Sequence, residues 1–404
     1  MTSIIITICI LLLLAYIFDV SAAKTKIPSV ILLLVLGFFV REITVFFEIS
    51  IPDLTTILPL LGTVGLILIV LEGSLELELN KTKFPLVKKT LILALVPMFI
   101  FSMVLAYFFH YFGDVNLKIG LANAIPFAII SSAIAIPSAQ NLASEEKEFI
   151  TYESSLSDIF GVIFFNFITL NDNIGTQSFG FFVIEILAIL AITFIATLGL
   201  AYLLSQIKHH VKYAPIILMI ILIYAISKEY HLPGLIFILL FGLFLGNIDE
   251  IQHMKYIDKL NPSTLIKEVH KFKDLTTEMT FLIRALFFLL FGYLIEANEL
   301  LNPDTILWAL GICVGVFSLR YAFLKIFKLR IIPLALIAPR GLITILLFFS
   351  IPIYQTTHLV NKSLIIQVIL LTALIMMIGL LSIKTKPEIK PEIMPEIKPE
   401  KNIK

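Results

Sequence analysis

Residues 119–142 read IGLANAIPFAIISSAIAIPSAQNL, an apolar stretch long enough to cross a lipid bilayer. Pro126 and Pro137 interrupt it, and the polar pair Ser131 and Ser132 lies between them. Proline removes a backbone donor and disturbs a helix, and hydrocarbon offers no water to the backbone groups that are freed. The stretch therefore predicts a broken membrane helix whose interruption is satisfied by protein or by a wet cavity.

A second apolar stretch is broken in the same way nearer the end of the chain. Residues 330–349 read RIIPLALIAPRGLITILLFF, with Pro339, Arg340 and Gly341 in the middle. Broken helices at corresponding places in two halves of a chain are typical of transporter binding sites. Simple proline kinks are the alternative, but the matching positions and the mid-span arginine favour a binding site.

The composition predicts an all-α polytopic membrane protein. The 404 residues are 59% hydrophobic with a mean hydropathy of +1.01, whereas soluble domains are about 45–50% apolar. The net charge of +1 gives no indication of a nucleic acid partner. Cys9 and Cys313 both lie in apolar runs and indicate neither a disulfide framework nor a metal site.

About thirteen apolar spans follow one another along the chain. They are predicted near 3–18, 28–47, 55–75, 90–112, 118–140, 149–171, 179–206, 213–227, 232–247, 277–296, 304–324, 331–352 and 363–383. When the spans are grouped as six, one and six, the fifth span of each six-helix half is the broken one.

The distribution of basic residues predicts the orientation. With the N-terminus outside, 23 of the 30 Lys and Arg residues lie in cytoplasmic segments and four lie in outer loops or at their edges. This bias follows the positive-inside rule. No Lys or Arg precedes the apolar run over 4–18, so we expect a first transmembrane helix rather than a cleaved signal peptide. We therefore expect a multi-pass protein of the cell membrane with a cytoplasmic C-terminus.

The chain divides into a transmembrane domain over residues 1–383 and a tail over residues 384–404. The tail repeats proline every four residues with charges between, which predicts an extended, disordered cytoplasmic segment. The linker over residues 249–276 is amphipathic and basic. We interpret it as a helical connector between the two halves, and a regulatory segment on the inner membrane surface is the alternative.

The sixth span carries two carboxylates, Glu153 and Asp158, within YESSLSDIFGVIFFNFITLN at 152–171. A charge at the bilayer centre costs at least ~2.5–3.5 kcal/mol, so such residues pair or face a cavity. The two differ by ~140° around the helix and ~7.5 Å along it, so they cannot share a face. We expect Glu153 to neutralise an arginine and Asp158 to hold a proton or a cation. The alternative is that both pair with arginines and only hold helices together.

Four further charges lie within or near spans. Glu72 is expected to reach the membrane interface, and Arg284 is expected to snorkel toward it. Arg320 lies in the inner half of the eleventh span, and Arg340 lies in the break of the twelfth. Their depth marks the last two as residues that pair or face a cavity.

These residues resemble the motifs of the monovalent cation/proton antiporters, which include the sodium/proton exchangers. The segment ESSLSD at 153–158 looks like the family's E-S-x-x-N-D motif, in which the last Asp binds the ion or the proton. Asp158 takes that position. Glu153 matches the motif glutamate, which in the exchanger branch forms a structural ion pair with an arginine on the eleventh helix. Arg320 is the similar residue here.

Two more motifs extend the resemblance over roughly residues 5–383. Residues 339–341, PRG, look like the L-R-G of the second broken helix, and residues 72–77, EGSLEL, are similar to the G-L-E-L-D ending of the third helix. Two features depart from the family. Ser131-Ser132-Ala133 stands where T-D-P is common and is closer to the S-S-x-A of the potassium-efflux branch, and Ser157 replaces the motif's Asn. K⁺/H⁺ antiport therefore stays open beside Na⁺/H⁺ antiport.

The resemblance implies two inverted repeats with a broken-helix crossing, a core holding spans 5, 6, 12 and 13, and a dimerisation domain. Asp158 would bind Na⁺ and H⁺ in turn, and one titrating carboxylate implies electroneutral exchange. Ser132, Ser154 and Ser157 would be oxygen ligands, since hard cations favour oxygen donors. Arg340 would counter the negative helix ends at the crossing.

Two other classes of function were weighed against exchange. A cation channel would use the same buried carboxylate to line a pore. A membrane enzyme has little support, because no metal-ligand cluster or nucleophile–base pair appears within the spans. No cofactor, no metal beyond the transported cation and no nucleic acid are expected. The expected partners are Na⁺ (or K⁺ or Li⁺), H⁺, membrane lipid and a second copy of the chain.

Overall fold

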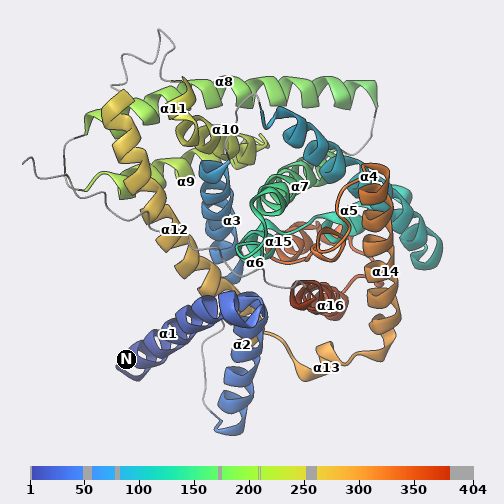
Figure 1. Cartoon of the computed structure of the whole chain (residues 1–404). Coiled ribbons are helices and arrows are strands. Elements are labelled where there is room, and N and C mark those ends of the chain that lie inside the picture. Colours follow the sequence, from blue (N-terminus) through green and yellow to red (C-terminus); the bar gives the residue numbers. More distant parts are fainter. Residues whose placement is uncertain are drawn as a thin grey trace, which may run out of the picture.

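The computed structural model describes residues 2–48, 57–77, 82–171, 175–207, 209, 211–251 and 262–382. The described part is built from helices and contains no β-strand, which confirms the predicted all-α fold (Figure 1). Helices follow the apolar runs because a helix satisfies its own backbone groups, as a bilayer requires.

The elements vary in length from one turn to more than thirty residues. In chain order they are α1 (Thr2–Thr25), α2 (Ser29–Phe46), α3 (Ile57–Glu76), α4 (Phe84–Gly113), α5 (Leu117–Ala128), α6 (Ser132–Ser138), α7 (Ser144–Leu170), α8 (Thr176–Gln206), α9 (Tyr213–Glu229), α10 (Gly234–Gly246), α11 (Ile248–Ile251), α12 (Pro262–Tyr293), α13 (Ala297–Leu300), α14 (Pro303–Ile326), η2 (Leu334–Leu336), α15 (Leu342–Ser350), η3 (Ile353–Gln355) and α16 (Lys362–Leu381).

Each of the thirteen predicted spans overlaps at least one of these helices. By length and composition, nine helices of the described part can cross a membrane, with the broken pair α5 and α6 counted as one. Shorter apolar helices lie at Ile6–Ala22 and Gly234–Gly246. The chain is therefore a multi-pass membrane protein, while the count of thirteen and the inverted repeats stay predictions.

The helices pack in two groups that meet at α3. In the first group, α12 packs on α2 and α3, and α10 packs on α3, α8 and α9. In the second group, α4 packs on α5 and α7, and α14 packs on α4 and α16. Figure 1 shows α12 and α3 on one side, α4 and α14 on the other, and α5, α6, α7 and α15 between them. Because α3 also contacts α6, α7 and α15, it borders both broken stretches.

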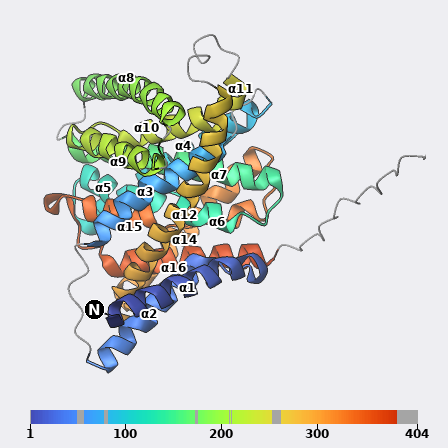
Figure 2. The ribbon, with the colours of Figure 1, turned by 90° about the vertical axis from the view of Figure 1, so that its left-hand side faces the viewer.

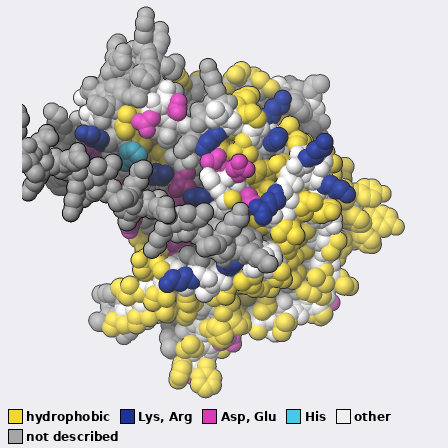
Figure 3. Space-filling view, viewed as in Figure 1, with side chains coloured by type: hydrophobic (Ala, Val, Ile, Leu, Met, Phe, Trp, Pro, Cys, Tyr) yellow, Lys and Arg dark blue, Asp and Glu magenta, His cyan; other side chains and the backbone are white. Residues whose placement is uncertain are grey.

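The surface has the apolar character that lipid contact requires. On the face shown in Figure 3, hydrophobic side chains cover much of the lower and right-hand surface, and charged ones gather above. Helix α8 is the least covered span, with 17% of its apolar window buried. Large side chains such as Phe181, Ile184 and Leu187 are exposed along it. Lipid or another apolar surface must cover them in the membrane.

One boundary differs from the sequence-based expectation. The predicted linker over residues 249–276 is helical at both ends, and α12 begins at Pro262 instead of near residue 277. The buried Leu265, Val269 and Phe272 follow helical spacing, so this segment packs as a continuation of the span. Figure 2 shows α12 running from one end of the molecule toward the other. The middle of the linker, 252–261, and the predicted tail over 384–404 lie outside the described residues.

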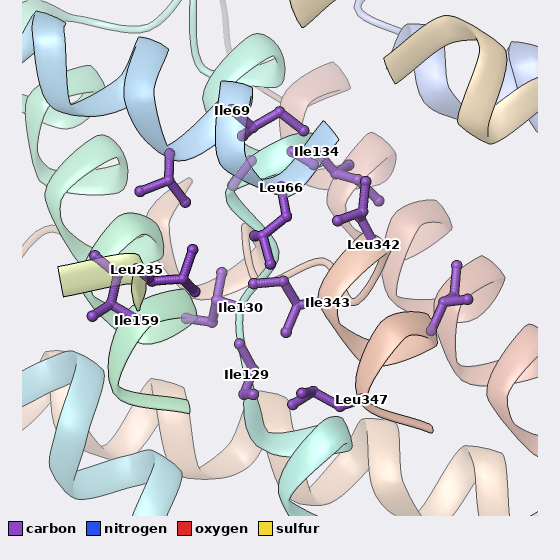
Figure 4. Close-up of a cluster of buried hydrophobic side chains, with 14 of the residues drawn as sticks. Leu66, Ile69, Ile129, Ile130, Ile134, Ile159, Leu235, Leu342, Ile343 and Leu347 are labelled. Carbon is purple, nitrogen blue, oxygen red and sulfur yellow. The ribbon is translucent and has the colours of Figure 1, made fainter. Parts of the chain in front are cut away.

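Both predicted interruptions are present. Helix α5 ends at Ala128 and α6 begins at Ser132, with three non-helical residues between them. In the second stretch, only η2 and α15 are helical, and α15 begins at Leu342. Figure 4 shows buried side chains from α3, α7 and α15 around the first interruption, among them Leu66 and Ile159. These apolar walls offer no hydrogen bonds, so the interrupted backbone needs polar partners from elsewhere in the protein.

Helices α2 and α12 approach so closely that each needs a glycine at the crossing. A Cβ atom on Gly37 would lie 2.2 Å from the carbonyl oxygen of Leu289, and one on Gly292 would lie 2.3 Å from that of Leu34. Backbone cannot turn aside as a side-chain tip can. Small residues allow this close approach. The resulting van der Waals packing stabilises the pair of helices, because the hydrophobic effect does not drive association inside a membrane.

Gly292→Ala is expected to destabilise the fold by about 1–3 kcal/mol, because the added methyl group overpacks the crossing. Gly311→Ala is the matched control, since nothing lies within 4 Å of a Cβ atom there. Thermal melting of the purified protein, followed by the fluorescence of Trp308, measures the difference. Equal melting temperatures for the two variants would contradict the close approach.

Candidate functional site

The two interrupted stretches are joined to each other at their breaks. The backbone N–H of Ser131 donates to the carbonyl oxygen of Pro339 at 2.9 Å. The hydroxyl of Thr344 donates to the carbonyl oxygen of Pro126, also at 2.9 Å. Proline at position 126 lies in the last turn of α5, where carbonyl groups lose their helical partners. Each break thus satisfies backbone groups that the other leaves open.

Arg340 satisfies more of these groups with its guanidinium. Its Nε donates to the carbonyl oxygen of Phe127 at 2.8 Å, and Nη2 donates to that of Ala128 at 3.2 Å. Nη1 donates to the carbonyl oxygen of Ala338 at 2.7 Å. The residue is 3% exposed. A cation at the C-terminal end of α5 opposes the partial negative charge of that helix end, which is the position predicted for Arg340.

Asp158 lies beside the first break and is only half satisfied. One carboxylate oxygen, Oδ2, accepts hydrogen bonds from the backbone N–H of Ser132, at 3.1 Å, and from the Ser132 hydroxyl. The other, Oδ1, has no hydrogen-bond partner among the described residues, although Asp158 is 1% exposed. A buried carboxylate oxygen without a partner is costly. It is therefore a natural point for a proton or a cation to bind.

The predicted serine ligands take different places. Ser132 contacts Asp158 directly. Ser157 accepts a hydrogen bond at 3.0 Å from the backbone N–H of Ile130, so it holds the break instead of facing Asp158. Ser154 is buried, and its hydroxyl donates to the carbonyl oxygen of Thr151 at 3.5 Å. The structure thus brings one of the three predicted serines to the carboxylate.

Two serines that the sequence analysis did not select have free hydroxyl oxygens. Ser131 and Ser155 are each 1% exposed, and neither hydroxyl has a partner among the described residues. Ser155 lies three residues before Asp158 and therefore projects from the same side of α7. This three-residue spacing from Asp158 is the signal in the sequence that identifies Ser155 as a candidate.

Glu153 and Arg320 form a bidentate ion pair between α7 and α14. Nη1 and Nη2 of Arg320 donate to Oε1 and Oε2 of Glu153 at 2.6 and 2.7 Å. Nε of Arg320 donates to the carbonyl oxygen of Leu334 at 2.7 Å. Both residues are buried. Glu153 is therefore fully engaged with α14, whereas Asp158 contacts α6, so the two carboxylates have separate surroundings.

A cavity of about 650 Å³ leads toward the site between α1, α3, α6 and α12. Ser132 lines it, but Asp158 does not, so the Ser132 side chain stands between the cavity and the carboxylate. Glu72 and Arg284 also line it. The expectation that they reach toward the membrane interface stays a prediction. Asp19 of α1, which the sequence analysis did not select, lies 3.8 Å from Arg284.

The arrangement defines a class of protein. A half-satisfied carboxylate lies beside two broken membrane helices that meet at their breaks, and a cavity approaches it. This is the construction of a secondary transporter for a small cation. Within the part of the chain that the structure describes, no group of three or more His, Cys, Asp or Glu residues could hold a resident metal ion.

The chain belongs to the sodium/hydrogen exchanger family. It matches the family model described as sodium/hydrogen exchanger, transmembrane, over residues 9–384. The resemblance to cation/proton antiporters is therefore confirmed, and the chain is a cation/proton antiporter, which makes it a transporter and not an enzyme. No curated protein matches it.

Two structures of the sodium proton antiporter MjNhaP1 from Methanocaldococcus jannaschii resemble this one. The structure at pH 8 has a TM-score of 0.68 and 18% identity, and the match covers 93% of this chain and 97% of that chain. A three-dimensional electron microscopy map has a TM-score of 0.65 and 18% identity, with 94% of each chain covered. At this identity the likeness shows a shared fold.

Removing either member of the Glu153–Arg320 pair leaves the other as an uncompensated buried charge, which costs about 3–5 kcal/mol. We expect Glu153→Ala and Arg320→Ala to reduce the amount of folded protein more than its cation affinity. Size-exclusion chromatography of a fluorescent fusion measures the folded amount.

Arg330→Ala is the matched control for this ion pair. Arg330 also contacts a carboxylate, Glu146, at 2.7 Å, but its side chain is 69% exposed. Exposed pairs contribute only about 0–1 kcal/mol, so this variant should fold like the wild type. Normal yields of Glu153→Ala and Arg320→Ala, with only a shifted cation affinity, would contradict the structural role of the pair.

Proposed function

We propose that the chain exchanges one monovalent cation, Na⁺ in the first instance, for one proton by competition at Asp158. Either ligand neutralises the carboxylate, and the loaded site can then change sides of the membrane. The empty site carries a charge whose passage through hydrocarbon is unfavourable. Exchange follows because the site moves only when it is loaded, and a single titrating carboxylate makes the exchange electroneutral.

The observation that carries this proposal is the unpartnered Oδ1 of Asp158. Ser132 fixes the other oxygen from the start of α6, so the carboxylate is oriented while one oxygen stays available. The free hydroxyl oxygens of Ser131, next to Ser132, and of Ser155, three residues before Asp158, are candidates for further ligands. Ser154 and Ser157 stay in the proposal as predicted ligands that would have to leave their present partners.

Oxygen donors suit hard cations such as Na⁺, Li⁺ and K⁺ and do not by themselves choose among them. Family membership favours Na⁺. The Ser131-Ser132 pair in the first break is the feature that favours K⁺/H⁺ antiport, as in the potassium-efflux branch. A cation channel through the same carboxylate is the third outcome that the experiment below separates.

We propose that the protein lies in the cell membrane with its N-terminus outside and that the cavity opens toward the cytoplasm. Glu76 and Lys147, which line the cavity, lie at the end of α3 and the start of α7. The positive-inside rule assigns both ends to the cytoplasmic side. Modification of single introduced cysteines by an impermeant reagent in intact cells and in everted vesicles tests this orientation.

We also propose a homodimer embedded in lipid. The exposed apolar side chains of α8 support this, because lipid and a second copy are the two surfaces available to cover them. We also propose that the second helix group, with both broken helices, forms a core that moves. Cross-linking in native membranes tests the oligomer, and a monomer under all conditions contradicts it.

The first experiment uses everted membrane vesicles, acidified inside, with a pH-sensitive dye. Addition of Na⁺, Li⁺ and K⁺ in turn should release protons in the wild type, and Asp158→Asn should reduce the release to the level of vesicles without the protein. Glu148→Gln is the matched control, because this carboxylate also lies on α7 but pairs with Lys83 away from the site. That variant should release protons like the wild type.

The same vesicles separate the competing functions. An imposed membrane potential should leave the rate unchanged at a fixed pH gradient, since the proposed exchange carries no net charge. A rate that follows the potential contradicts electroneutrality, and net cation current without a proton gradient indicates a channel. Full activity of Asp158→Asn removes Asp158 from the mechanism.

Ser132→Ala should weaken the apparent cation affinity about tenfold, because a hydrogen bond to a charged group contributes ~1.5 kcal/mol or more. The bond that is lost stabilises the ionised carboxylate, so without it the proton competes better with the cation for Asp158. Ser138→Ala is the control, since Ser138 lies on the same short helix and donates only to the carbonyl oxygen of Ile134. Cation titrations of proton release measure both variants, and equal affinities would contradict the role of Ser132.

A further inference from the structure

The cavity that approaches the crossing has charges of both signs on its walls. Asp19 on α1, Glu72 and Glu76 on α3, and Glu278 on α12 supply the acids. Two bases line it as well, namely Lys147 at the start of α7 and Arg284 in the C-terminal third of α12. A cation that reaches Ser132 from this cavity must therefore pass a positive charge in the cavity wall.

Arg284 is held loosely compared with the arginines of the crossing. Its Nη2 lies 3.8 Å from Oδ1 of Asp19, which is longer than a hydrogen bond. That oxygen already accepts a hydrogen bond from Ser29 at 2.9 Å. Among the described residues, Arg284 has no closer ion pair, whereas Arg320 makes two short bonds to a single carboxylate. The guanidinium of Arg284 is thus inside the cavity without being clamped there.

A guanidinium in this position acts on any cation in the cavity in two ways. It repels the cation directly. It also neutralises part of the negative charge of Asp19 and Glu72, which would otherwise attract the cation. Both effects are stronger than in water, because the side chain is only 11% exposed and the surrounding walls have a low dielectric constant. The cation and Arg284 therefore compete for the same acids.

We propose that Arg284 is a tethered competitor of the transported cation that sets the apparent affinity of the cavity side. In the empty cavity its guanidinium neutralises part of the acidic wall, and an entering cation displaces it toward Asp19. This inference rests on the proposed exchange at Asp158 and adds to it a specificity-determining residue outside the crossing. The simpler alternative is that Arg284 only anchors α1 to α12.

The test titrates Na⁺ and Li⁺ in the vesicle assay with Arg284→Gln, Arg284→Lys and Asp19→Asn. Removing the charge should lower the half-saturating cation concentration about three- to tenfold with little change in maximal rate. Arg284→Lys should stay within twofold of the wild type, because it keeps the charge. Asp19→Asn should raise the half-saturating concentration, because it removes an attracting acid and frees the competitor.

A double-mutant cycle separates competition from simple attraction by Asp19. If Asp19 acts partly by holding Arg284, Asp19→Asn should have a smaller effect in the Arg284→Gln background than in the wild type. Arg41→Gln is the matched control. Arg41 is also half-buried and pairs with Glu42 and Glu296, but it does not line the cavity. Its half-saturating concentration should equal that of the wild type.

A second readout keeps the test independent of transport. Cation-dependent thermal stabilisation of the purified protein reports binding directly, and Arg284→Gln should need less Na⁺ than the wild type for the same rise in melting temperature. An unchanged or raised half-saturating concentration in a folded Arg284→Gln protein overturns the proposal. A second outcome also overturns the proposal: Arg284→Gln misfolds, while Asp19→Asn behaves like the wild type. The role of Arg284 would then be structural.

The two proposals fail in different ways. If no cation releases protons from wild-type vesicles, the proposed exchange has failed, whatever Arg284 does. If the wild type exchanges and Asp158→Asn does not, but Arg284→Gln has the wild-type affinity by both readouts, only the role of Arg284 has failed.

Discussion

The hydrogen bonds from Arg340 to the carbonyl oxygens of Phe127 and Ala128 are the contact on which the rest of the site depends. A helix that stops inside a membrane leaves carbonyl groups that hydrocarbon cannot satisfy. Arg340 itself lies in the second interruption, so one side chain closes the end of α5 and ties the two breaks together. The hydrogen bonds from Ser131 to Pro339 and from Thr344 to Pro126 complete the tie between the two breaks beside Asp158.

The same contact helps to explain why Asp158 has no charged partner in the described core. The guanidinium of Arg320 donates its hydrogen bonds to Glu153 and to the carbonyl oxygen of Leu334. Arg340 is used up by three carbonyl groups. No buried cation of the described core is therefore left to neutralise Asp158, and its only partner there is Ser132. Under the proposed exchange, the neutralising charge would come from the solvent as a proton or a cation.

The sequence predicted those parts of the site that depend on local pattern. Prolines in apolar runs marked both breaks, and the spacing of Glu153 and Asp158 on one helix required separate surroundings, which the structure shows. The serines were harder, because which hydroxyl is free depends on partners such as the backbone of Ile130. The cavity wall was missed, since Asp19 and Arg284 meet only through the packing of α1 on α12, and no local pattern encodes that contact.

The border between the two helix groups differs in kind from the crossing. Directional hydrogen bonds hold the crossing together whatever occupies Asp158. Where α3 meets α6 and α15, its described contacts are apolar or involve glycine. Gly62 of α3 faces Leu346 of α15, and Gly73 faces Ile136 of α6. Contacts of this kind can exchange without breaking a directional bond. Under the proposed exchange at Asp158, these contacts would let the second helix group move as one unit along α3.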